Sequence, residues 1–229
     1  MAKQLKLTGH MYSRLKIGRD LTKKKSKERN FSKERSIISY VLSSLHPNSK
    51  MFFLDQIKLI TYQTPRYAWI KRGQAVISYD WPERLLYTVN VIASLEQIEA
   101  LVITKGEIKS EDTVHFVQGF LKSNEKEGRS VVILLDQASW HRSDLVNNSS
   151  IHQYLLLNIP GRYDLNFVES VFSYIRNHWR RRRAGLESDT EIFNEIVEIY
   201  RNANTEKRFT NWRRGYFKVL LHILLAWIE

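Results

Sequence analysis

The sequence contains no cysteine, only four prolines and no long apolar run. The absence of cysteine excludes disulfide bonds, thiolate metal ligands and a cysteine nucleophile, and it is consistent with a reducing cytoplasm. The first ten residues, MAKQLKLTGH, lack the apolar core of a secretion signal. The longest apolar run, VLLHILLAWI, is shorter than the roughly 20 residues that span a bilayer. We therefore expect a cytoplasmic protein without a membrane partner.

Acidic residues are scarce relative to basic ones, 24 against 36, which gives a formal net charge of +12. Such an excess favours a polyanionic partner, because Lys and Arg side chains that contact phosphates release counterions. The first 35 residues hold 12 Lys and Arg against three Asp and Glu, and they include Lys23, Lys24 and Lys25. This segment is either an arm that follows DNA phosphates or a solvated, disordered tail.

The apolar residues, 43% of the 229-residue chain, suit one α/β domain with a sizeable core. Helical spacing predicts a helix over Ser32–Leu45. β-Branched and aromatic residues predict an antiparallel meander over residues 51–105, with strands at Met51–Asp55, Lys58–Tyr62, Tyr67–Lys71 and Leu85–Leu95. Beyond it we expect a helix at Thr113–Leu121, strands at Ser130–Leu135 and His152–Leu157, and helices at Leu165–Trp179 and Thr190–Ala203.

This order of elements matches the ribonuclease H-like fold. We therefore predict an α/β protein whose mixed central sheet is flanked by helices. Residues 1–50 would form a basic arm and a helix, residues 51–205 the domain with this fold, and residues 206–229 an apolar helix. From sequence, that last helix either packs against the core, forms a dimer contact or is a tail that follows a frameshift.

Three acidic residues stand where this fold would bring them together. Asp55 and Asp136 each end a predicted strand, and Glu169 lies in the first turn of a predicted helix. Ligands bind at the carboxyl edge of such sheets, and clustered carboxylates can hold two divalent ions for in-line cleavage of a phosphodiester. Taken singly, each acid is equally an ordinary turn, cap or helix-dipole residue.

Sequence motifs surround all three acids. LLDQASWHRS at Asp136 and IPGRYDLNFVESVFSYIRNHW at Glu169 resemble the second and third carboxylate motifs of mariner-type transposases, in the bacterial insertion-sequence branch. FFLDQ at Asp55, followed by Trp69 and Gly73, resembles the first motif. The resemblance covers about residues 50–203 and keeps the order of the motifs.

The resemblance implies an endonuclease that cuts DNA at transposon ends and transfers the cut strand to target DNA. Its catalytic and metal-binding residues would be Asp55, Asp136 and Glu169, which would hold two Mg²⁺ or Mn²⁺ ions. Its partners would be transposon-end and target duplexes and a second copy of the chain, at the nucleoid. Asn166 and His141 would support the site, although a capping or surface role suits His141 equally well.

Basic residues occupy the Glu169 helix and the segment after it. One or two cations at a helix C-terminus are explained by the helix dipole. Four in succession favour contact with the DNA backbone, which is independent of base sequence. The candidate DNA-binding residues here are Arg176, Arg180, Arg181, Arg182 and Arg183.

The chain also departs from the family pattern. Gln56 stands where an acid usually follows the first aspartate, Gln137 replaces the common Asn, and Phe167 replaces a proline. The first 50 residues are too few for the family's pair of helix-turn-helix domains, although KLTGHMYSRLKIGRDL resembles the last helix of one. We therefore expect a truncated copy, or the second of two split reading frames with a separate helix-turn-helix protein.

Two other functions remain open on the sequence alone. A catalytically silent DNA-binding or assembly protein, left from a truncated element, would bind DNA with a steep salt dependence and never cut it. A cellular nuclease of the same fold, such as a junction resolvase, would use similar carboxylates. The mariner-like motifs around Asp136 and Glu169 favour the transposase over this nuclease.

Overall fold

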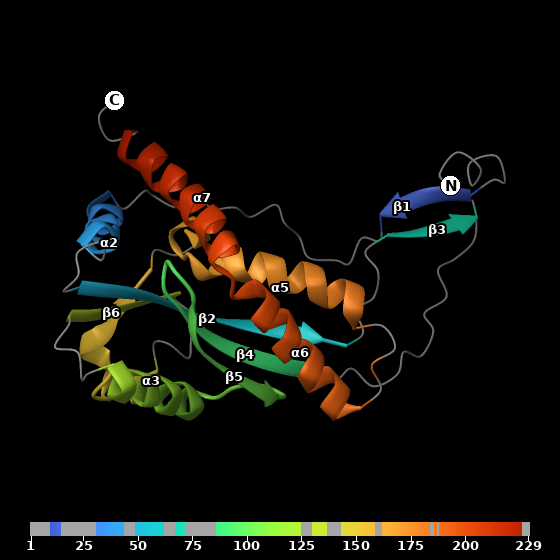
Figure 1. Cartoon of the computed structure of the whole chain (residues 1–229), viewed down its shortest axis with the longest axis horizontal. Helices are drawn as coiled ribbons and strands as arrows, with labels where there is room; N and C mark the ends of the chain where they lie inside the picture. Colours follow the sequence, from blue (N-terminus) through green and yellow to red (C-terminus); the bar gives the residue numbers. More distant parts are fainter. Residues whose placement is uncertain are drawn as a thin grey trace. The chain divides into compact units, whose positions relative to one another are not determined.

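A computed structural model of the chain describes residues 10–14, 31–43, 49–61, 67–71, 86–124, 130–136, 143–158, 162–183, 186 and 188–225. The chain forms two compact units (Figure 1). Unit 1 comprises residues 1–29 and 60–85, and unit 2 comprises residues 30–59 and 86–229. All three predicted carboxylates belong to unit 2.

Unit 1 contains a two-stranded antiparallel ribbon. Its strands are β1 (His10–Arg14) and β3 (Tyr67–Lys71), paired in register over all five residues of each. The strand at Tyr67–Lys71 is correctly predicted, but its place in a central meander is wrong, because its partner is β1. The helix suggested by the resemblance around His10 is also wrong over these five residues, which form a strand.

Unit 2 is built on a five-stranded mixed sheet with the order β5-β4-β2-β6-β7. Its strands are β2 (Ser49–Ile60), β4 (Leu86–Ala93), β5 (Ile98–Lys105), β6 (Ser130–Leu135) and β7 (Leu155–Leu157). β6 is parallel to both β2 and β7, whereas β4 and β5 pair antiparallel. The predicted mixed sheet is confirmed.

Two strands of this sheet differ from the prediction. The separate strands expected at Met51–Asp55 and Lys58–Tyr62 are one continuous strand, β2, because the polar pair Asp55–Gln56 lies inside it rather than after it. β5 (Ile98–Lys105) is missing from the prediction. It lies at the edge of the sheet, where most of its residues are only half-buried and its hydrophobic alternation is weak.

One face of the sheet packs against α3 (Ser110–Asn124) (Figure 1). Phe52 and Leu54 of β2 belong to this apolar cluster, and the rings of Phe52 and Phe120 meet edge-to-face with centroids 4.8 Å apart. The short helix α4 (Asp144–Asn147) adds Val146 to the same cluster. Buried apolar residues of β2, β4, β6, α3 and α4 thus form the core on this face.

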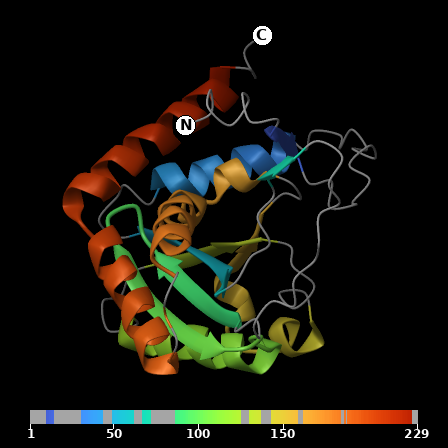
Figure 2. The same cartoon turned by 90° about the vertical axis from the view of Figure 1, so that its right-hand side faces the viewer.

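The opposite face of the sheet packs against α5 (Val168–Arg182) and α7 (Glu206–Leu225) (Figure 2). Successive strand residues alternate between faces, so Phe53 points away from Phe52. Its ring lies 5.6 Å from that of Phe167 and 5.7 Å from that of Tyr216. Phe53 therefore contacts one aromatic residue of the third carboxylate motif, Phe167, and one of α7, Tyr216.

The remaining helices lie close to their predicted positions. α2 (Phe31–Ser43) buries Ile37, Ile38 and Val41. α6 (Asp189–Ala203) begins at a capping box between Ser188 and Glu191. The strand predicted at His152–Leu157 is shorter than expected, because its first half is the 3-10 turn η3 (His152–Tyr154). A second such turn, η4 (Tyr163–Leu165), precedes α5.

The apolar C-terminal helix, α7, is 20 residues long and begins at Glu206, the first residue of the predicted segment. Its buried residues lie on one side: Phe209, Tyr216, Leu220 and Ile223. Of the three roles left open by the sequence, packing against the core is the one these contacts support. No helix in the described segments has an apolar stretch sufficient to cross a membrane.

Phe167, which stands where the family has a proline, is fully buried. Its ring lies 5.9 Å from that of Phe209 and 5.5 Å from that of Tyr216. Its φ of −57° would suit proline, and the preceding residue is extended, with ψ 103°, as a residue before proline prefers. The backbone would therefore accept the proline, and only the aromatic packing would disappear.

We expect Phe167→Ala to lower the free energy of unfolding by about 3–5 kcal/mol, the usual cost of deleting a buried phenylalanine ring. Phe167→Pro should lower it by slightly less, because proline restricts the unfolded chain by about 0.4–1 kcal/mol. Urea denaturation in chelator measures both. A proline variant as stable as the parent would contradict a structural role for the ring.

Candidate active site

The register of β2 and β6 places two of the carboxylates side by side. The strands pair in parallel, and the last pair of their ladder is Leu54 opposite Leu135. Asp55 and Asp136 are the next residues on each strand, so they occupy neighbouring positions at the same point along the sheet. Asp55 is two residues after Phe53 and therefore shares its face, the one covered by α5.

The third motif reaches this face through the turn before α5. The Nδ2 of Asn166 donates a hydrogen bond to the Oδ2 of Asp55 across 3.3 Å. The backbone N–H of Glu169 donates to the carbonyl of Asn166 at 3.1 Å. Asn166 is therefore a direct link between the strand that carries Asp55 and the first turn of the helix that carries Glu169.

Asp55 lies in an unfavourable environment for a charge, with 9% of its surface exposed. Burial raises the pKa of its carboxyl to about 8, and the nearby charges of Asp136 and Glu169 raise it as well. The N–H of Gln56, 2.7 Å from Oδ1, and the Arg176 guanidinium act in the opposite direction. The three predicted carboxylates are thus close enough to interact electrostatically.

The donor chemistry of this site fits a hard divalent cation. A cation would offset the unfavourable burial of the Asp55 charge and its repulsion with two other acids. The buried Oδ1 of Asn166 has no hydrogen-bond partner among the described residues, so a further oxygen is available beside Asp55. In the described segments, no three acidic or histidine side chains are already arranged as ligands of one metal ion. The suitability of this site for a cation therefore rests on the type of its donor atoms and on its charge.

Gln56, the residue that departs from the family pattern after the first aspartate, lies outside this cluster. Its Nε2 donates to the Oδ1 of Asn90 at 3.1 Å, and Asn90 in turn donates to Thr113 at the start of α3. These contacts belong to the α3 side of the sheet, opposite the carboxylates. The departure therefore leaves the face of Asp55 unchanged.

Arg162 fixes the turn that precedes α5. Its guanidinium donates to both carboxylate oxygens of Asp164, at 2.8 and 2.9 Å, and to Glu34 of α2. Glu34 is 1% exposed. Sequence reasoning missed this pair, although a signal existed, because Glu34 lies at helical spacing on the same apolar stripe as Ile37 and Ile38.

Arg176 lies beside Glu169, one of the three acids. Its Nη1 donates to the Glu169 Oε2 at 3.3 Å, and its guanidinium sits 5.6 Å from the centre of the Phe172 ring. The arginine is 44% exposed. It can therefore orient Glu169 and still face an anionic ligand.

The other predicted basic residues are not all equivalent. Arg180 and Arg181 are exposed and form no ion pair within the described segments. Arg182 is paired with Glu195 of α6 at 2.9 Å. Arg183 is partly buried, and burial together with Arg180 lowers its pKa. Lys23, Lys24, Lys25, His141 and Gln137 lie outside the described residues.

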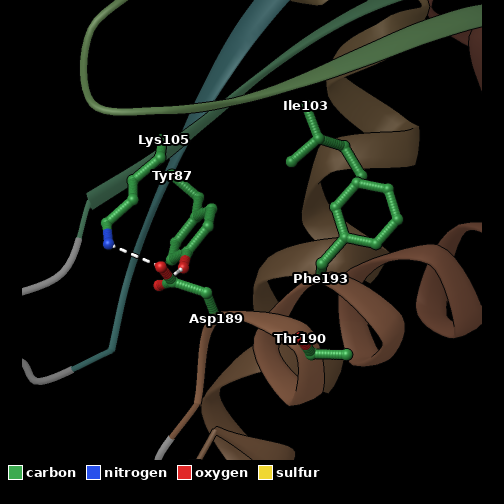
Figure 3. Close-up of a pocket in the computed structure, with 6 residues that line it drawn as sticks. All are labelled: Tyr87, Ile103, Lys105, Asp189, Thr190 and Phe193. Atoms are coloured by element: carbon green, nitrogen blue, oxygen red, sulfur yellow. Dashed lines mark hydrogen bonds and ion pairs between the residues drawn. The ribbon is translucent and has the colours of Figure 1, made fainter.

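A separate pocket of about 320 Å³ lies between the β4–β5 pair and the start of α6 (Figure 3). Asp189 accepts hydrogen bonds there from the Tyr87 hydroxyl and, at 2.6 Å, from the Lys105 ammonium. Burial and the bond to Asp189 raise the pKa of Tyr87 to about 12. Tyr87, Lys105 and Asp189 satisfy one another here, and none of the three predicted catalytic carboxylates lines the pocket.

Comparison with known proteins agrees with the motifs. Residues 50–191, well over half of the chain, match the family described as DDE superfamily endonuclease. The chain belongs to this family. No match to a curated protein was found.

Solved structures of the Mos1 mariner transposase share the fold. The Mos1 paired-end complex with Mn matches with a TM-score of 0.61 and 13% identity, over 97% of this chain and 67% of that one. The Mos1 strand transfer complex matches with 0.61 and 12%, over 98% and 68%. The Mos1 catalytic domain with raltegravir and Mg matches with 0.59 and 12%, over 87% and 94%. The predicted endonuclease, with the fold of a mariner transposase catalytic domain, is confirmed.

The raised pKa of Asp55 predicts how stability depends on pH in the absence of metal. The folded state binds the proton more tightly than the unfolded state, whose pKa is about 3.9. The contribution of Asp55 to stability should therefore be greatest below pH 4 and be lost as the pH rises towards 8, at up to about 1.4 kcal/mol per pH unit. Asp55→Asn should flatten that decline and be more stable than the parent at pH 8.5.

Urea denaturation in chelator, across this pH range, measures the effect. The control is Asp144→Asn, which changes an exposed aspartate. An unchanged slope in Asp55→Asn would show that the carboxyl is not held in the protonated form.

Proposed function

We propose that the chain is a transposase that cuts DNA at transposon ends and joins the cut strand to target DNA. Asp55, Asp136 and Glu169 are its catalytic residues and the ligands of two Mg²⁺ or Mn²⁺ ions. The observation that carries the proposal is the placement of Asp55 and Asp136 at adjacent positions on parallel strands, with Asn166 linking Asp55 to the Glu169 turn. Membership of a DDE endonuclease family supports it.

Some residues of the site would bind the metal ions, and others orient these ligands. When bound, divalent ions supply activation of the attacking oxygen and stabilisation of charge on the leaving oxygen. Asp55 and Asp136 offer the carboxylates, and the amide of Asn166 holds one oxygen of Asp55 in place. Arg176 orients Glu169 through their ion pair. Burial of Asp55 keeps competing water away from its carboxylate.

DNA would bind along the basic C-terminal part of α5. Arg180 and Arg181 are exposed and form no ion pair in the described part of the chain, so their charges are available for phosphates. Arg176, Arg182 and Arg183 extend this surface, and Lys23, Lys24 and Lys25 would add contacts from the N-terminal arm. His141, which follows Asp136 in its motif, would support the site.

We further propose that residues 51–205 carry the catalysis, that residues 1–50 form a basic DNA-binding arm and a helix, and that residues 206–229 form an apolar helix that packs against the core. A second copy of the chain and a separate helix-turn-helix protein would complete the assembly at the nucleoid. The Mos1 structures described as paired-end and strand transfer complexes support an assembly on two DNA ends. Sedimentation of the chain on duplex DNA tests the pairing directly.

Nicking of supercoiled plasmid DNA tests the reaction itself. We expect the purified chain to nick with Mg²⁺ or Mn²⁺ and not with chelator. Asp136→Ala should reduce the rate by more than about 100-fold, beyond the 10- to 100-fold typical of residues that only support metal ligands. Asp144→Ala, at an exposed aspartate of α4, should cut normally. Cutting by Asp136→Ala would refute the assignment, and DNA binding without cutting by the parent would favour the silent DNA-binding protein.

Salt dependence of DNA binding tests the α5 surface. Removal of one arginine that touches a phosphate should reduce the slope of log K against log salt by about 0.9. We expect Arg180→Ala with Arg181→Ala to reduce the slope by about one to two in total. Arg182→Ala should have a smaller effect, because Glu195 already neutralises that side chain. Equal slopes for the double variant and the parent would remove this surface from the interface.

A further inference from the structure

Tyr216 of α7 contacts two of the three segments that carry the site, the one with Asp55 and the one with Glu169. Its hydroxyl donates a buried hydrogen bond of 2.9 Å to the carbonyl of Leu165, the residue before Asn166. Its ring packs edge-to-face on Phe53, 5.7 Å away, and on Phe167, 5.5 Å away. Phe53 lies two residues before Asp55, and Phe167 lies two residues before Glu169.

The Tyr216 hydroxyl is the donor of this hydrogen bond, because the Leu165 carbonyl oxygen can only accept. Burial raises the pKa of the phenol, and the nearby charge of Asp164 raises it further, so the hydroxyl keeps the proton that it donates. The bond ties α7 to the backbone of the turn between η4 and α5.

The turn at Asn166 is also held by two other hydrogen bonds. Asn166 follows Leu165 directly, donates to Asp55 through its side chain and accepts the Glu169 N–H through its carbonyl. A shift of the Leu165 carbonyl would move Asn166, and with it the separation between Asp55 and Glu169. Displacements near 1 Å are large on the scale of catalytic geometry.

We propose that Tyr216 is a positioning residue, which holds the Asn166–Glu169 turn against β2 and so sets the spacing of Asp55 and Glu169 for a divalent cation. The inference rests on the proposed function, because it assumes that these carboxylates bind the ion. It extends the site to a helix that follows all three carboxylate motifs in the chain.

The alternative is that Tyr216 is only a core residue, and a matched pair of variants separates the two roles. Tyr216→Phe keeps the ring and removes the hydrogen bond. Tyr200→Phe removes another buried hydroxyl, on α6, which has no hydrogen-bond partner in the described part of the chain. Leu220→Ala removes a buried side chain of α7 one turn further along the helix, and it controls for general loosening of α7.

The experiment measures Mn²⁺ binding to the full chain by the decrease of the free-ion electron paramagnetic resonance signal. Plasmid nicking against Mn²⁺ concentration and thermal unfolding in chelator accompany it. Tyr216→Phe should weaken Mn²⁺ binding by about three- to tenfold, the range expected for removal of one hydrogen bond. Half-maximal nicking should move to higher Mn²⁺ by the same factor, with the KM for DNA unchanged and the rate restored at saturating Mn²⁺.

Tyr200→Phe should bind Mn²⁺ as the parent does. Leu220→Ala should lower the unfolding temperature more than Tyr216→Phe while affecting Mn²⁺ binding less. Parental Mn²⁺ binding by Tyr216→Phe would overturn the inference and leave the proposed function intact if the parent still nicks and Asp136→Ala does not. Equal weakening by Leu220→Ala would also overturn it, because the effect would then follow α7 packing in general. A parent chain that neither binds Mn²⁺ nor nicks would overturn both.

Discussion

The parallel pairing of β2 with β6 is the constraint on which the rest of the site depends. In a parallel ladder, residues that follow the same paired position lie beside each other, and strand alternation sends them to the same face. Asp55 and Asp136 therefore become neighbours through the backbone alone. The α3 side of the sheet supplies the apolar core that stabilises this pairing, and the α5 side remains for chemistry. Asn166, Glu169 and Arg176 are placed relative to that pair: Asn166 donates to Asp55, and Arg176 donates to Glu169.

Much of this arrangement could be predicted from the sequence. The strands before Asp55 and Asp136 are strongly apolar and the motif around Glu169 is specific, so the fold class follows from local patterns. The convergence of the three acids is expected only through that fold. β2 was harder, because Asp55 and Gln56 resemble a strand end, and only their partners across the sheet show that the strand continues. The partner of a buried charge is harder to predict. Helical spacing places Glu34 among buried residues, but nothing near it in the sequence indicates Arg162, 128 residues away.

The site also departs locally from the rules that stabilise a fold. A carboxyl with a pKa raised to about 8 and a buried amide oxygen without a partner in the described part of the chain lie next to each other, and both oppose folding when no cation is present. Such departures gather where function requires them. The aromatic cluster of Phe53, Phe167 and Tyr216 adjoins these groups along the chain, because Phe53 lies two residues before Asp55 and Phe167 follows Asn166. The packing of these rings stabilises the fold and offsets the destabilising effect of the buried Asp55 carboxyl and the buried Asn166 oxygen. Stabilising and destabilising residues are therefore neighbours in this part of the protein.

The position of α7 in the chain has a consequence for synthesis. A ribosome adds Asp55, Asp136 and Glu169 before it adds any residue of α7 (Glu206–Leu225). A nascent chain thus carries all three acids while the Leu165 carbonyl still lacks the hydroxyl that it accepts from Tyr216 in the folded protein. The contact between Tyr216 and the Leu165 carbonyl can therefore form only after all three acids have been synthesised.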